Sequence, residues 1–596
     1  RMRTQDMLGI TDLYEERLKN LFSVECWGGA TFDVALRFLK EDPWERLEKL
    51  REQMPSALLQ MLFRGSNALG YTNYPDNVLR RFIQLSAQSG IDVFRIFDAL
   101  NWIENMRVSI DEVLKSGKIC EASICYSGDL SSPAEKKYTL EYYLKMAQKL
   151  EKMGVHFLAI KDMAGLCKPK AAKILFKELK KNIKIPIHFH THDTSGNGVA
   201  TLLNASDAGV DIVDVAIDSW SGFTSQPSFG AVLESLDGNN RDPKISSAVV
   251  RTAANYWEGV RKQYQPFESK TRTSMSEVYL HQMPGGQYTN LREQARSMGI
   301  TDERWPELAS MYAEVNKIFG DVIKVTPISK VVGDMAIYML ANNIQIEDVL
   351  DPKKDVGFPA SVIEFFSGRL GQPYKGFPKA LQKKILKGKK PINYRFGSKL
   401  PSLKIKNRTK ELEKNYNEII SEKDTISQIF FPEVFDEYMK HKKKFGNTSV
   451  IPTSNYFFGM NTDEEIYVSI EPGKTLIIRY FTLSEPNEKG FRTVYFELNG
   501  QARSVDIKDN SIAVDDLAKE IADPSNKDHV AAPIPGLLVD VAVTEGIKVP
   551  KGAKLCTIEA MKMETVIYAD QPGTVERLCV KAGENIEAQQ LLLIIK

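Results

Sequence analysis

Two histidines at the end of an apolar, strand-like run could bind a metal ion. The run IPIHFHTHD places His190 and His192 two positions apart. Side chains two apart in a strand point to the same side, so both imidazoles can face one ion. His188 shares this parity and would point the same way, deeper in the fold. One histidine on an apolar strand is usually a core residue, but two at a strand end, followed by Asp193, indicate a ligand pair that suits Zn, Mn or Co better than Mg.

A lysine closes the preceding strand-like run. Lys161 lies in the motif AIKDMAG. One interpretation is an ion pair with Asp162. The other is a partly desolvated amine that is neutral often enough to react with CO2. The resulting carbamate would be an anionic oxygen ligand beside the two histidines, and the spacing alone leaves both interpretations open.

The elements that must position these residues repeat along residues 20–220. Short apolar or β-branched runs alternate with amphipathic helical stretches such as LEYYLKMAQKLEKMG. Strands that recur about every 30 residues with helices between them predict a parallel sheet of βαβ units. A polar residue closes most runs, and in a (β/α)8 barrel such strand ends form the catalytic face. The runs are Leu21–Trp27, Leu58–Phe63, Asp92–Phe97, Cys120–Cys125, His156–Ile160, Ile185–Phe189 and Asp211–Ile217.

The fold class that this pattern favours is α/β, as a (β/α)8 TIM barrel with one strand missing. A closed barrel needs eight strands, one more than the runs supply. The segment RMRTQDMLGITDLYEERLKN, before the first run, is typical of a helix, so we expect the first strand to be absent. An open doubly wound sheet would normally carry a nucleotide-binding glycine fingerprint, which no run shows. Because Arg1 precedes Met2, we expect the sequence to be part of a longer chain.

Composition excludes several classes of protein. The 596 residues predict about four domains at roughly 150 residues each. With 79 Lys and Arg against 77 Asp and Glu, no overall charge attracts nucleic acid or an anionic membrane. No apolar run reaches the roughly 18 residues of a membrane helix. Six cysteines without a CxxC pair indicate reduced thiols, so we expect a cytoplasmic location.

Beyond the barrel, the pattern changes three times. Residues 240–390 are typical of helices, with MPGGQYTN and VTPISK expected as loops. Residues 400–445 are charge-rich and amphipathic, which favours solvated helices over a nucleic-acid patch. Residues 464–508 alternate in polarity, with PG and NEKG turns, and predict a small antiparallel sheet. DPSNKDH then predicts a short linker.

The last 65 residues contain an internal repeat. Pro535-Gly536 recurs as Pro572-Gly573, Gly546 as Gly583 and Leu555 as Leu592, each 37 residues later. Two such halves predict an all-β flattened barrel with pseudo-twofold symmetry, in which the joining segment EAMKM is an exposed turn.

EAMKM is the biotin-attachment signature of biotin carboxyl carrier domains, and its lysine is Lys562. An exposed lysine on a tight turn can enter a ligase and then carry biotin on a long flexible arm. Tethering raises the concentration of the carrier at each active site. Lipoyl domains share the fold but lack methionines on both sides of the lysine. We therefore expect covalent biotin on Lys562, attached by a biotin protein ligase.

The order of the motifs resembles the pyruvate carboxylase family from the first residues to the last. The matching segments are VECWGGATFDVA, LLQMLFRGSN, GYTNYPDN, DVFRIFDALN, LAIKDMAG, HFHTHDTSGNG, TSQPS, QMPGGQYTN, KVTPISKVVGD and EAMKM. The resemblance implies carboxyl transfer from carboxybiotin to pyruvate, giving oxaloacetate. It also implies a homotetramer and, in the full enzyme, an acyl-CoA effector.

The resemblance assigns roles residue by residue. It implies that carbamylated Lys161, His190 and His192 bind a divalent metal, Zn or Mn. Arg64, which closes LLQMLFR, would bind the pyruvate carboxylate, a task suited to a planar bidentate donor. Thr326 of KVTPISK would pass a proton between the pyruvate methyl group and the biotin ureido nitrogen, since a hydroxyl both donates and accepts. Asp33 and Tyr71 match positions around the incoming biotin.

Two parts of the family pattern are absent from the sequence. One is the D-x-x-x-R-D-A-H-Q strand, which supplies a further aspartate ligand and is the strand missing from our count. The other is the ATP-grasp biotin carboxylase domain, so this chain would depend on that domain as a partner for carboxybiotin. The expected division is a barrel at 1–240, its helical extension at 241–395, a tetramerisation/allosteric α+β domain at 396–520, a linker at 521–530 and the carrier at 531–596.

Two other functions remain alternatives. The α subunit of a sodium-pumping oxaloacetate decarboxylase joins a similar barrel to a biotin domain. It commonly has a Pro/Ala-rich linker, whereas this chain has the short DPSNKDHVAAP. A biotinylated scaffold with an inactive barrel is the third, and bound metal would distinguish it from an active enzyme.

Overall fold

The computed structural model describes residues 2–268, 273–471, 473–487, 490–509, 520–524, 526–560 and 563–596, and for Met563 the backbone only. The chain divides into two compact units. The first comprises Arg1–Leu291 and Glu307–Gly459, and the second comprises Arg292–Pro306 and Met460–Lys596. Within the described residues, no helix is both long enough and apolar enough to cross a membrane.

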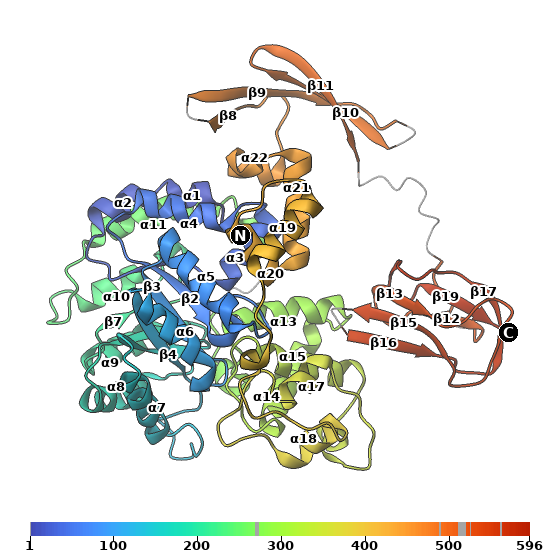
Figure 1. Ribbon diagram of the computed structural model, residues 1–596, viewed down its shortest axis with the longest axis horizontal. Coiled ribbons are helices and arrows are strands. Elements are labelled where there is room, and N and C mark those ends of the chain that lie inside the picture. Colours follow the sequence, from blue (N-terminus) through green and yellow to red (C-terminus); the bar gives the residue numbers. More distant parts are fainter. Residues whose placement is uncertain are drawn as a thin grey trace. The chain divides into compact units, whose positions relative to one another are not determined.

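The first unit contains a parallel sheet of seven strands in the order β1-β2-β3-β4-β5-β6-β7, with helices around it (Figure 1). The sequence order equals the spatial order because each strand is followed by a crossover helix that returns the chain to the same edge. This confirms the predicted α/β barrel-type fold and the number of strands. The strands are β1 (Val24–Trp27), β2 (Leu59–Arg64), β3 (Val93–Phe97), β4 (Ile119–Cys125), β5 (Phe157–Asp162), β6 (Ile187–Thr191) and β7 (Ile212–Val213).

The last strand is shorter than predicted. The run Asp211–Ile217 forms only the two-residue β7, which pairs His188 with Ile212 and Phe189 with Val213. The N–H of the next residue, Asp214, still donates to the carbonyl of Phe189 at 3.0 Å, but the strand ends at Val213 and the Asp214 carboxylate turns to side chains of β6. β1 and β7 are the two edges of this sheet.

The crossover helices begin at local capping signals. Asp42 accepts a hydrogen bond from the N–H of Trp44 at the start of α4, where Pro43 occupies the first turn. Thr139 caps α7 and Ser228 caps α10 in the same way. The helices are α3 (Gly29–Val34), α4 (Pro43–Gln53), α5 (Asp76–Ser89), α6 (Ile103–Lys115), α7 (Leu140–Lys152), α8 (Pro169–Asn182), α9 (Gly198–Asp207) and α10 (Phe229–Leu236).

The segment before β1 is helical, as predicted, but it forms two helices. These are α1 (Thr4–Leu8) and α2 (Thr11–Arg17), with Gly9 between them. A Cβ on Gly9 would lie 2.4 Å from the hydroxyl oxygen of Tyr256, so the chain breaks where it passes this ring.

Residues 247–386 are largely helical, as predicted. MPGGQYTN, predicted as a loop, instead begins α13. Gly285 donates its N–H to the carbonyl of Met163 at 3.2 Å, and a Cβ there would lie 2.7 Å from Thr224. The glycine therefore permits close packing against the barrel. The helices are α11 (Ser247–Arg261), α12 (Val278–His281), α13 (Gly285–Ser297), α14 (Trp305–Ile318), α15 (Ile328–Ala341), α16 (Ile346–Leu350), α17 (Ala360–Phe366) and α18 (Lys379–Leu386).

The charge-rich segment is helical, as predicted. It comprises α19 (Ile405–Tyr416), α20 (Glu422–Phe430) and α21 (Pro432–Phe445), followed by α22 (Thr453–Phe458).

In the second unit, the alternating segment forms an antiparallel sheet in the order β11-β10-β9-β8. Its strands are β8 (Glu465–Glu471), β9 (Lys474–Leu483), β10 (Phe491–Leu498) and β11 (Gln501–Lys508).

The C-terminal segment consists of two four-stranded sheets related by the sequence repeat. One has the order β12-β19-β17-β14 and the other β16-β15-β13-β18. β13, β14 and β15 begin 37 residues before β17, β18 and β19 and pair in the same pattern, which confirms the flattened barrel. The strands are β12 (His529–Ala531), β13 (Gly536–Val541), β14 (Lys548–Val549), β15 (Lys554–Ala560), β16 (Met563–Tyr568), β17 (Gly573–Leu578), β18 (Asn585–Ile586) and β19 (Leu591–Ile595).

Candidate metal and substrate site

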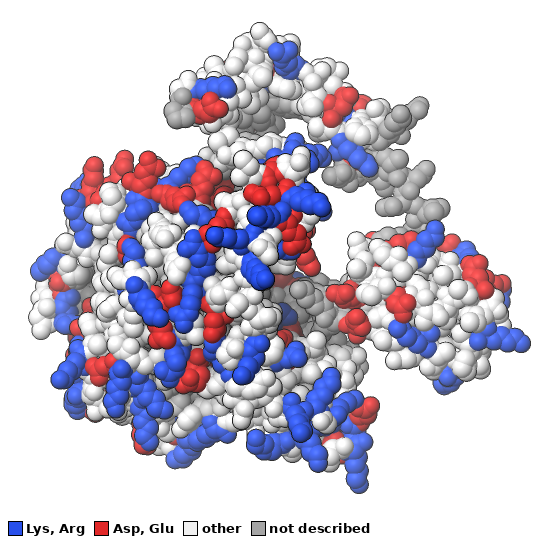
Figure 2. All heavy atoms as spheres, in the orientation of Figure 1, with Lys and Arg blue, Asp and Glu red and all other residues white. Residues whose placement is uncertain are grey.

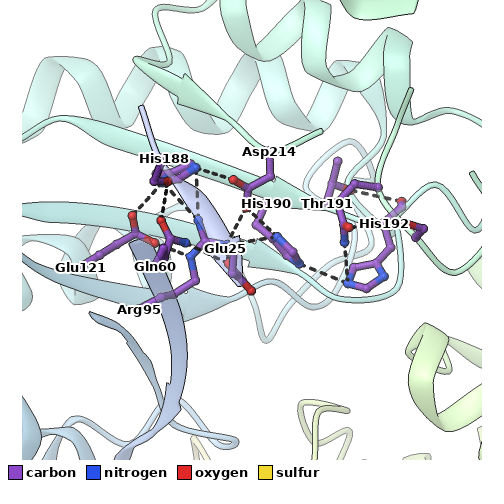
Figure 3. Close-up of polar contacts among 12 residues, drawn as sticks. Glu25, Gln60, Arg95, Glu121, His188, His190, Thr191, His192 and Asp214 are labelled. Atoms are coloured by element: carbon purple, nitrogen blue, oxygen red, sulfur yellow. Dashed lines mark hydrogen bonds and ion pairs between the residues drawn. The ribbon is translucent and has the colours of Figure 1, made fainter. Parts of the chain in front are cut away.

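The two predicted metal-binding histidines converge at the end of β6. Their Nε2 atoms lie 3.2 Å apart (Figure 3). Two nitrogens at about 2.1 Å from one ion would be about 3.0 Å apart in octahedral and about 3.4 Å in tetrahedral geometry. The pair therefore fits a shared divalent metal. Within the described residues, no group of three or more His, Cys, Asp or Glu side chains is arranged to hold a metal.

Hydrogen bonds on the other ring nitrogens orient both imidazoles. His190 Nδ1 lies 2.7 Å from Asp214 Oδ2, and His192 Nδ1 lies 2.6 Å from the carbonyl oxygen of Thr224. Carbonyl and carboxylate oxygens only accept, so each Nδ1 donates and each Nε2 keeps its lone pair in the neutral ring. Burial, and then the charge of Lys161, lower the pKa of His192 to about 4 and hold the pKa of His190 well below its usual value. Both rings are thus neutral at neutral pH, the state in which an imidazole can bind a metal.

Lys161 lies on β5 beside these histidines. Its register partner across the parallel ladder is His190. The side chain is buried, and burial lowers the pKa of its amine. Asp162 does not pair with it, because that carboxylate accepts hydrogen bonds from the N–H groups of Leu166 and Cys167 and from Thr191 Oγ1. Among the described residues, Lys161 has no carboxylate in ion-pair contact, and its Nζ lies 5.5 Å from the ring centroid of Phe97.

Deeper in the barrel than the histidine pair lies a buried ionic network that the sequence patterns did not predict. Arg95 on β3 contacts Glu121 on β4, and it donates to Asp214 Oδ2 at 2.5 Å and to Glu25 Oε2 at 3.0 Å (Figure 3). His188 joins the network between Glu121 and Asp214, with 2.7 Å to each carboxylate. The prediction that His188 points inward but deeper than His190 is confirmed.

Opposite charges in contact keep His188, Glu121 and Asp214 ionised, whereas burial raises the pKa of Glu25. Burial alone would lower the pKa of His188, but the carboxylates of Asp214 and Glu121 raise it to about 9. Burial likewise opposes ionisation of Glu121, but Arg95 and His188 lower its pKa to about 2. The carboxylate that orients His190 is therefore itself fixed by an arginine and an imidazolium.

A second cluster brings together Arg64, Asp33 and Tyr71. Arg64 closes β2, and its Nη1 donates to the carbonyls of Leu69 at 2.6 Å and Gly70 at 3.2 Å. The guanidinium carbon lies 5.3 Å from the ring centroid of Tyr71, whose side chain is half exposed. Burial lowers the pKa of Arg64, while nearby Tyr71 and Asp33 oppose the shift. The cluster presents one partly buried cation beside a half-exposed aromatic ring.

Thr326 is placed by a different set of contacts. It lies just before α15, and its side chain is partly buried. A Cβ on Gly333 of α15 would lie 2.7 Å from Gln287 of α13, and α13 begins against Met163, two residues beyond Lys161. The described contacts thus link Thr326 to Lys161 and the histidine pair only indirectly, through α15 and α13.

Comparisons with known proteins agree with this geometry. Family models match at residues 87–220 (HMGL-like), 278–479 (Conserved carboxylase domain) and 528–595 (Biotin-requiring enzyme). The carboxyl transferase domain of Rhizobium etli pyruvate carboxylase, solved with pyruvate and biocytin, is 52% identical, with a TM-score of 0.84 and 86% of each chain covered. The chain belongs to the pyruvate carboxylase family.

The curated relatives are longer than this chain. The pyruvate carboxylase of Bacillus subtilis strain 168 is 50% identical over 596 residues, which are 100% of this chain and 52% of the relative. That of Staphylococcus aureus strain Mu50 is 47% identical over 597 residues, again 100% and 52%. The chain spans about half the length of the curated relatives it matches, and the predicted family resemblance is confirmed.

In this pyruvate carboxylase family member, two strands of the biotin-type domain flank the predicted attachment site in the sequence. β15 and β16 pair antiparallel, with Ala560 opposite Met563. Met561 and Lys562, between them in the sequence, lie outside the described residues. The match of residues 528–595 to biotin-requiring enzymes confirms the predicted domain type.

Proposed function

We propose that this chain transfers a carboxyl group from carboxybiotin to pyruvate and forms oxaloacetate, as the carboxyltransferase part of an ATP- and biotin-dependent pyruvate carboxylase. The observation that carries the proposal is the convergence of His190 and His192 beside buried Lys161, in a barrel-type unit that shares 52% identity with a carboxyl transferase domain solved with pyruvate and biocytin. The relatives named above favour this reaction over the decarboxylase subunit considered from the sequence.

We assign the metal to His190, His192 and the carbamate of Lys161. The two neutral imidazoles and an anionic oxygen form a ligand set for Zn or Mn. The bound ion would polarise the pyruvate carbonyl as a Lewis acid. Asp214 and the Thr224 carbonyl hold the imidazoles in the required tautomer.

Arg64 is the group we assign to the pyruvate carboxylate. It is a partly buried cation at the end of β2, at the same carboxyl-terminal end of the parallel strands as Lys161 and His190. Its Nη1 is held by two carbonyl groups, which fixes the plane of the guanidinium and leaves other N–H groups for a carboxylate. Asp33 and Tyr71, beside it, would border the position of the biotin ring.

Proton transfer is the role we assign to Thr326. Its Oγ1 would take the proton from the pyruvate methyl group and pass it to the biotin ureido nitrogen. Carboxybiotin supplies the CO2 that the pyruvate enolate attacks. Because the described contacts place Thr326 at the start of α15, the position of this helix against α13 would control the transfer.

The rest of the enzyme is also part of the proposal. Covalent biotin on Lys562, attached by a biotin protein ligase, would receive its carboxyl group from a biotin carboxylase domain beyond this half of the relatives' length. We retain the division 1–240, 241–395, 396–520, 521–530 and 531–596, a homotetramer, and an acyl-CoA effector of the full enzyme. Within the described part of the chain, the outer edge of β1 pairs with no strand, and β1 lines a cavity of about 300 Å³ together with Trp257. An eighth strand would pair at this edge.

The test is decarboxylation of oxaloacetate by the purified chain with free biotin. We expect turnover by the unmodified chain and at least a hundredfold loss in Thr326→Ala, because general acid–base catalysis contributes about 10²–10⁴-fold. Thr252→Ala is the matched control, since this threonine bonds only within α11, to the carbonyl of Ala248. Bound metal without turnover in the unmodified chain would contradict the proposal, and absence of both would support the inactive scaffold.

A further inference from the structure

A second cavity lies away from the histidine pair, in the first unit. It has a volume of about 700 Å³ and is formed by the start of α6, one face of α7 and the loop at residues 372–375. Ligand sites typically have volumes of about 300–1,000 Å³, so a small molecule would fit. Its lining includes Trp102, Tyr142, Lys149, Lys152, Tyr374 and Lys375.

Positive charge on α7 faces this cavity. Lys145, Lys149 and Lys152 follow helical spacing and all three line the cavity. Lys145 pairs with Glu141 at 2.5 Å. The ammonium groups of Lys149 and Lys152, by contrast, contact no carboxylate among the described residues, and both side chains are exposed. Figure 2 shows Lys and Arg side chains gathered where α7 lies in Figure 1.

The opposite wall adds a third uncompensated cation. Lys375 Nζ donates to the carbonyl oxygen of Lys136 at 3.0 Å, a contact that positions the ammonium without neutralising it. Glu104 is the acidic residue of the lining, and Arg107 already pairs with it at 2.9 Å. The cavity therefore has a net positive potential that favours an anion.

An aromatic surface completes the cavity. The rings of Tyr142 and Tyr374 lie 4.6 Å apart, and Tyr142 is held in place by Asn101 Nδ2 at 2.9 Å. Tyr374 is 41% exposed, so part of its ring is open to solvent at the cavity. The two ring planes are tilted by 51°, and Lys375 Nζ lies 5.9 Å from the centroid of Tyr374. The exposed part of the Tyr374 ring is available for stacking.

We propose that this cavity binds a phosphorylated ligand with a planar ring, of the mononucleotide class. Lys149 and Lys152 are three residues apart, a rise of about 4.5 Å along the helix, so both ammonium groups can contact one phosphate. The ring of the ligand stacks on Tyr374, as bases stack on aromatic side chains in other nucleotide sites. This site is separate from the carboxyltransferase cluster and does not rest on the function proposed above.

AMP binding to the full chain, measured by equilibrium dialysis, tests the proposal. We expect saturable binding with a dissociation constant below about 1 mM. The double variant Lys149→Glu/Lys152→Glu should weaken it at least about tenfold, since a phosphate then meets two carboxylates. Lys173→Glu/Lys177→Glu is the control, because it makes the same charge change on exposed positions of α8 outside the cavity.

Tyr374→Ala separates the two halves of the site. We expect it to weaken AMP about tenfold or more, because base stacking contributes about 1–3 kcal/mol, and to leave binding of ribose 5-phosphate unchanged. If the α7 and α8 double variants lost AMP affinity equally, AMP would be attracted only by the general positive charge of the surface, and the proposal would be overturned. Absence of saturation by AMP in the unmodified chain would overturn it as well.

Discussion

His190 Nδ1 lies 2.7 Å from Asp214 Oδ2, and the other oxygen of the same carboxylate lies 2.7 Å from His188 Nε2. One carboxylate thus fixes a neutral imidazole on one side and contacts a protonated one on the other. Because Arg95 also donates to Asp214, the carboxylate has little freedom to move. The orientation of the candidate metal ligand therefore depends on charges that are buried below it.

Asp214→Asn should weaken metal binding. An amide offers a donor as well as an acceptor, so it cannot accept from His190, His188 and Arg95 together. Loss of a carboxylate that orients a metal-binding histidine typically lowers metal affinity by about 10–100-fold. We expect this loss for Zn²⁺, measured by competition with a chromophoric chelator, together with an altered Co²⁺ absorption spectrum.

Asp211→Asn provides the control for that measurement. Asp211 lies three residues earlier and pairs with Lys180 at the surface, so it should leave metal affinity unchanged. Asp214→Glu should recover part of the affinity if orientation is what matters. Unaltered Zn²⁺ affinity and an unaltered Co²⁺ spectrum in folded Asp214→Asn would show that the hydrogen bond does not orient His190.

Arg64→Lys should raise the KM for pyruvate with little change in metal content. A lysine keeps the charge but loses the planar, bidentate donor geometry. Hydrogen bonds to charged groups contribute about 1.5–3 kcal/mol, which corresponds to about 10–100-fold in KM. Steady-state kinetics measure the change, and Arg251→Lys, at a surface pair with Glu234, is the control. A pyruvate KM that does not move would remove Arg64 from the substrate site.

The strands of the barrel could be predicted because they are short apolar runs, most of which are closed by a polar residue. Periodicity also placed His190 and His192 on one side of β6, and the structure agrees. The ionic network could not be predicted in this way, because Arg95 and Glu121 lie inside apolar runs and meet only when β3 and β4 pair. The sequence did offer one signal for Arg95 and Glu121: each is a charged residue inside a run that is otherwise apolar, which predicts a buried ion pair.

The position of Thr326 could not be predicted from its local sequence. Its sequence context, VTPISK, indicates only a turn before a helix, and its position depends on how α15 packs against α13 through Gly333. Similarly, the two glycines of MPGGQYTN suggested a loop, whereas Gly285 is needed because the barrel comes within van der Waals distance of it. Contacts between segments far apart in the sequence determine such positions, and local secondary-structure propensity carries no information about these contacts.

Acid should destabilise the first unit through His281. This buried histidine accepts a hydrogen bond from the N–H of Met283 at 3.0 Å, and burial lowers its pKa to about 4. The unfolded chain binds the proton near pH 6.5, so stability is full above that pH and falls as the pH drops toward 4. We expect a loss on the order of 3 kcal/mol from this group.

Urea unfolding of the parent chain and His281→Gln between pH 7 and pH 4 measures that loss. Glutamine can accept the same hydrogen bond but does not titrate, so the difference between the two chains isolates the histidine. The variant should lose less stability on acidification than the parent. Parallel pH profiles for both chains would show that His281 is protonated as readily in the folded state as in the unfolded state.

Gly536→Ala and Gly573→Ala should each impair the carrier domain and its biotinylation. The two glycines are 37 residues apart and make equivalent close contacts. A Cβ on Gly536 would lie 2.4 Å from the carbonyl oxygen of Glu559, and one on Gly573 would lie 2.8 Å from that of Lys596. Overpacking against backbone costs about 1–3 kcal/mol or more. Streptavidin detection of biotin after incubation with a biotin ligase gives the readout.

Gly259→Ala is the matched control for those variants. A Cβ there would meet no atom within 4 Å, and alanine favours the helix in which it lies. Lys562→Arg should carry no biotin at all. Full biotinylation of both glycine variants at elevated temperature would show that the close approach can relax, and the repeat would then be a feature of topology without a strict requirement for glycine.

Lys161→Met should lose bound metal, and removal of CO2 should do the same to the parent chain. The amine of Lys161 lies in a buried position beside His190, without a carboxylate partner among the described residues, so it can add to CO2 when neutral. Zinc content after dialysis in CO2-free buffer, with and without added bicarbonate, measures the dependence. Methionine keeps the volume and burial of the side chain, so a folded variant that binds zinc as tightly as the parent would show that His190 and His192 hold the ion without Lys161.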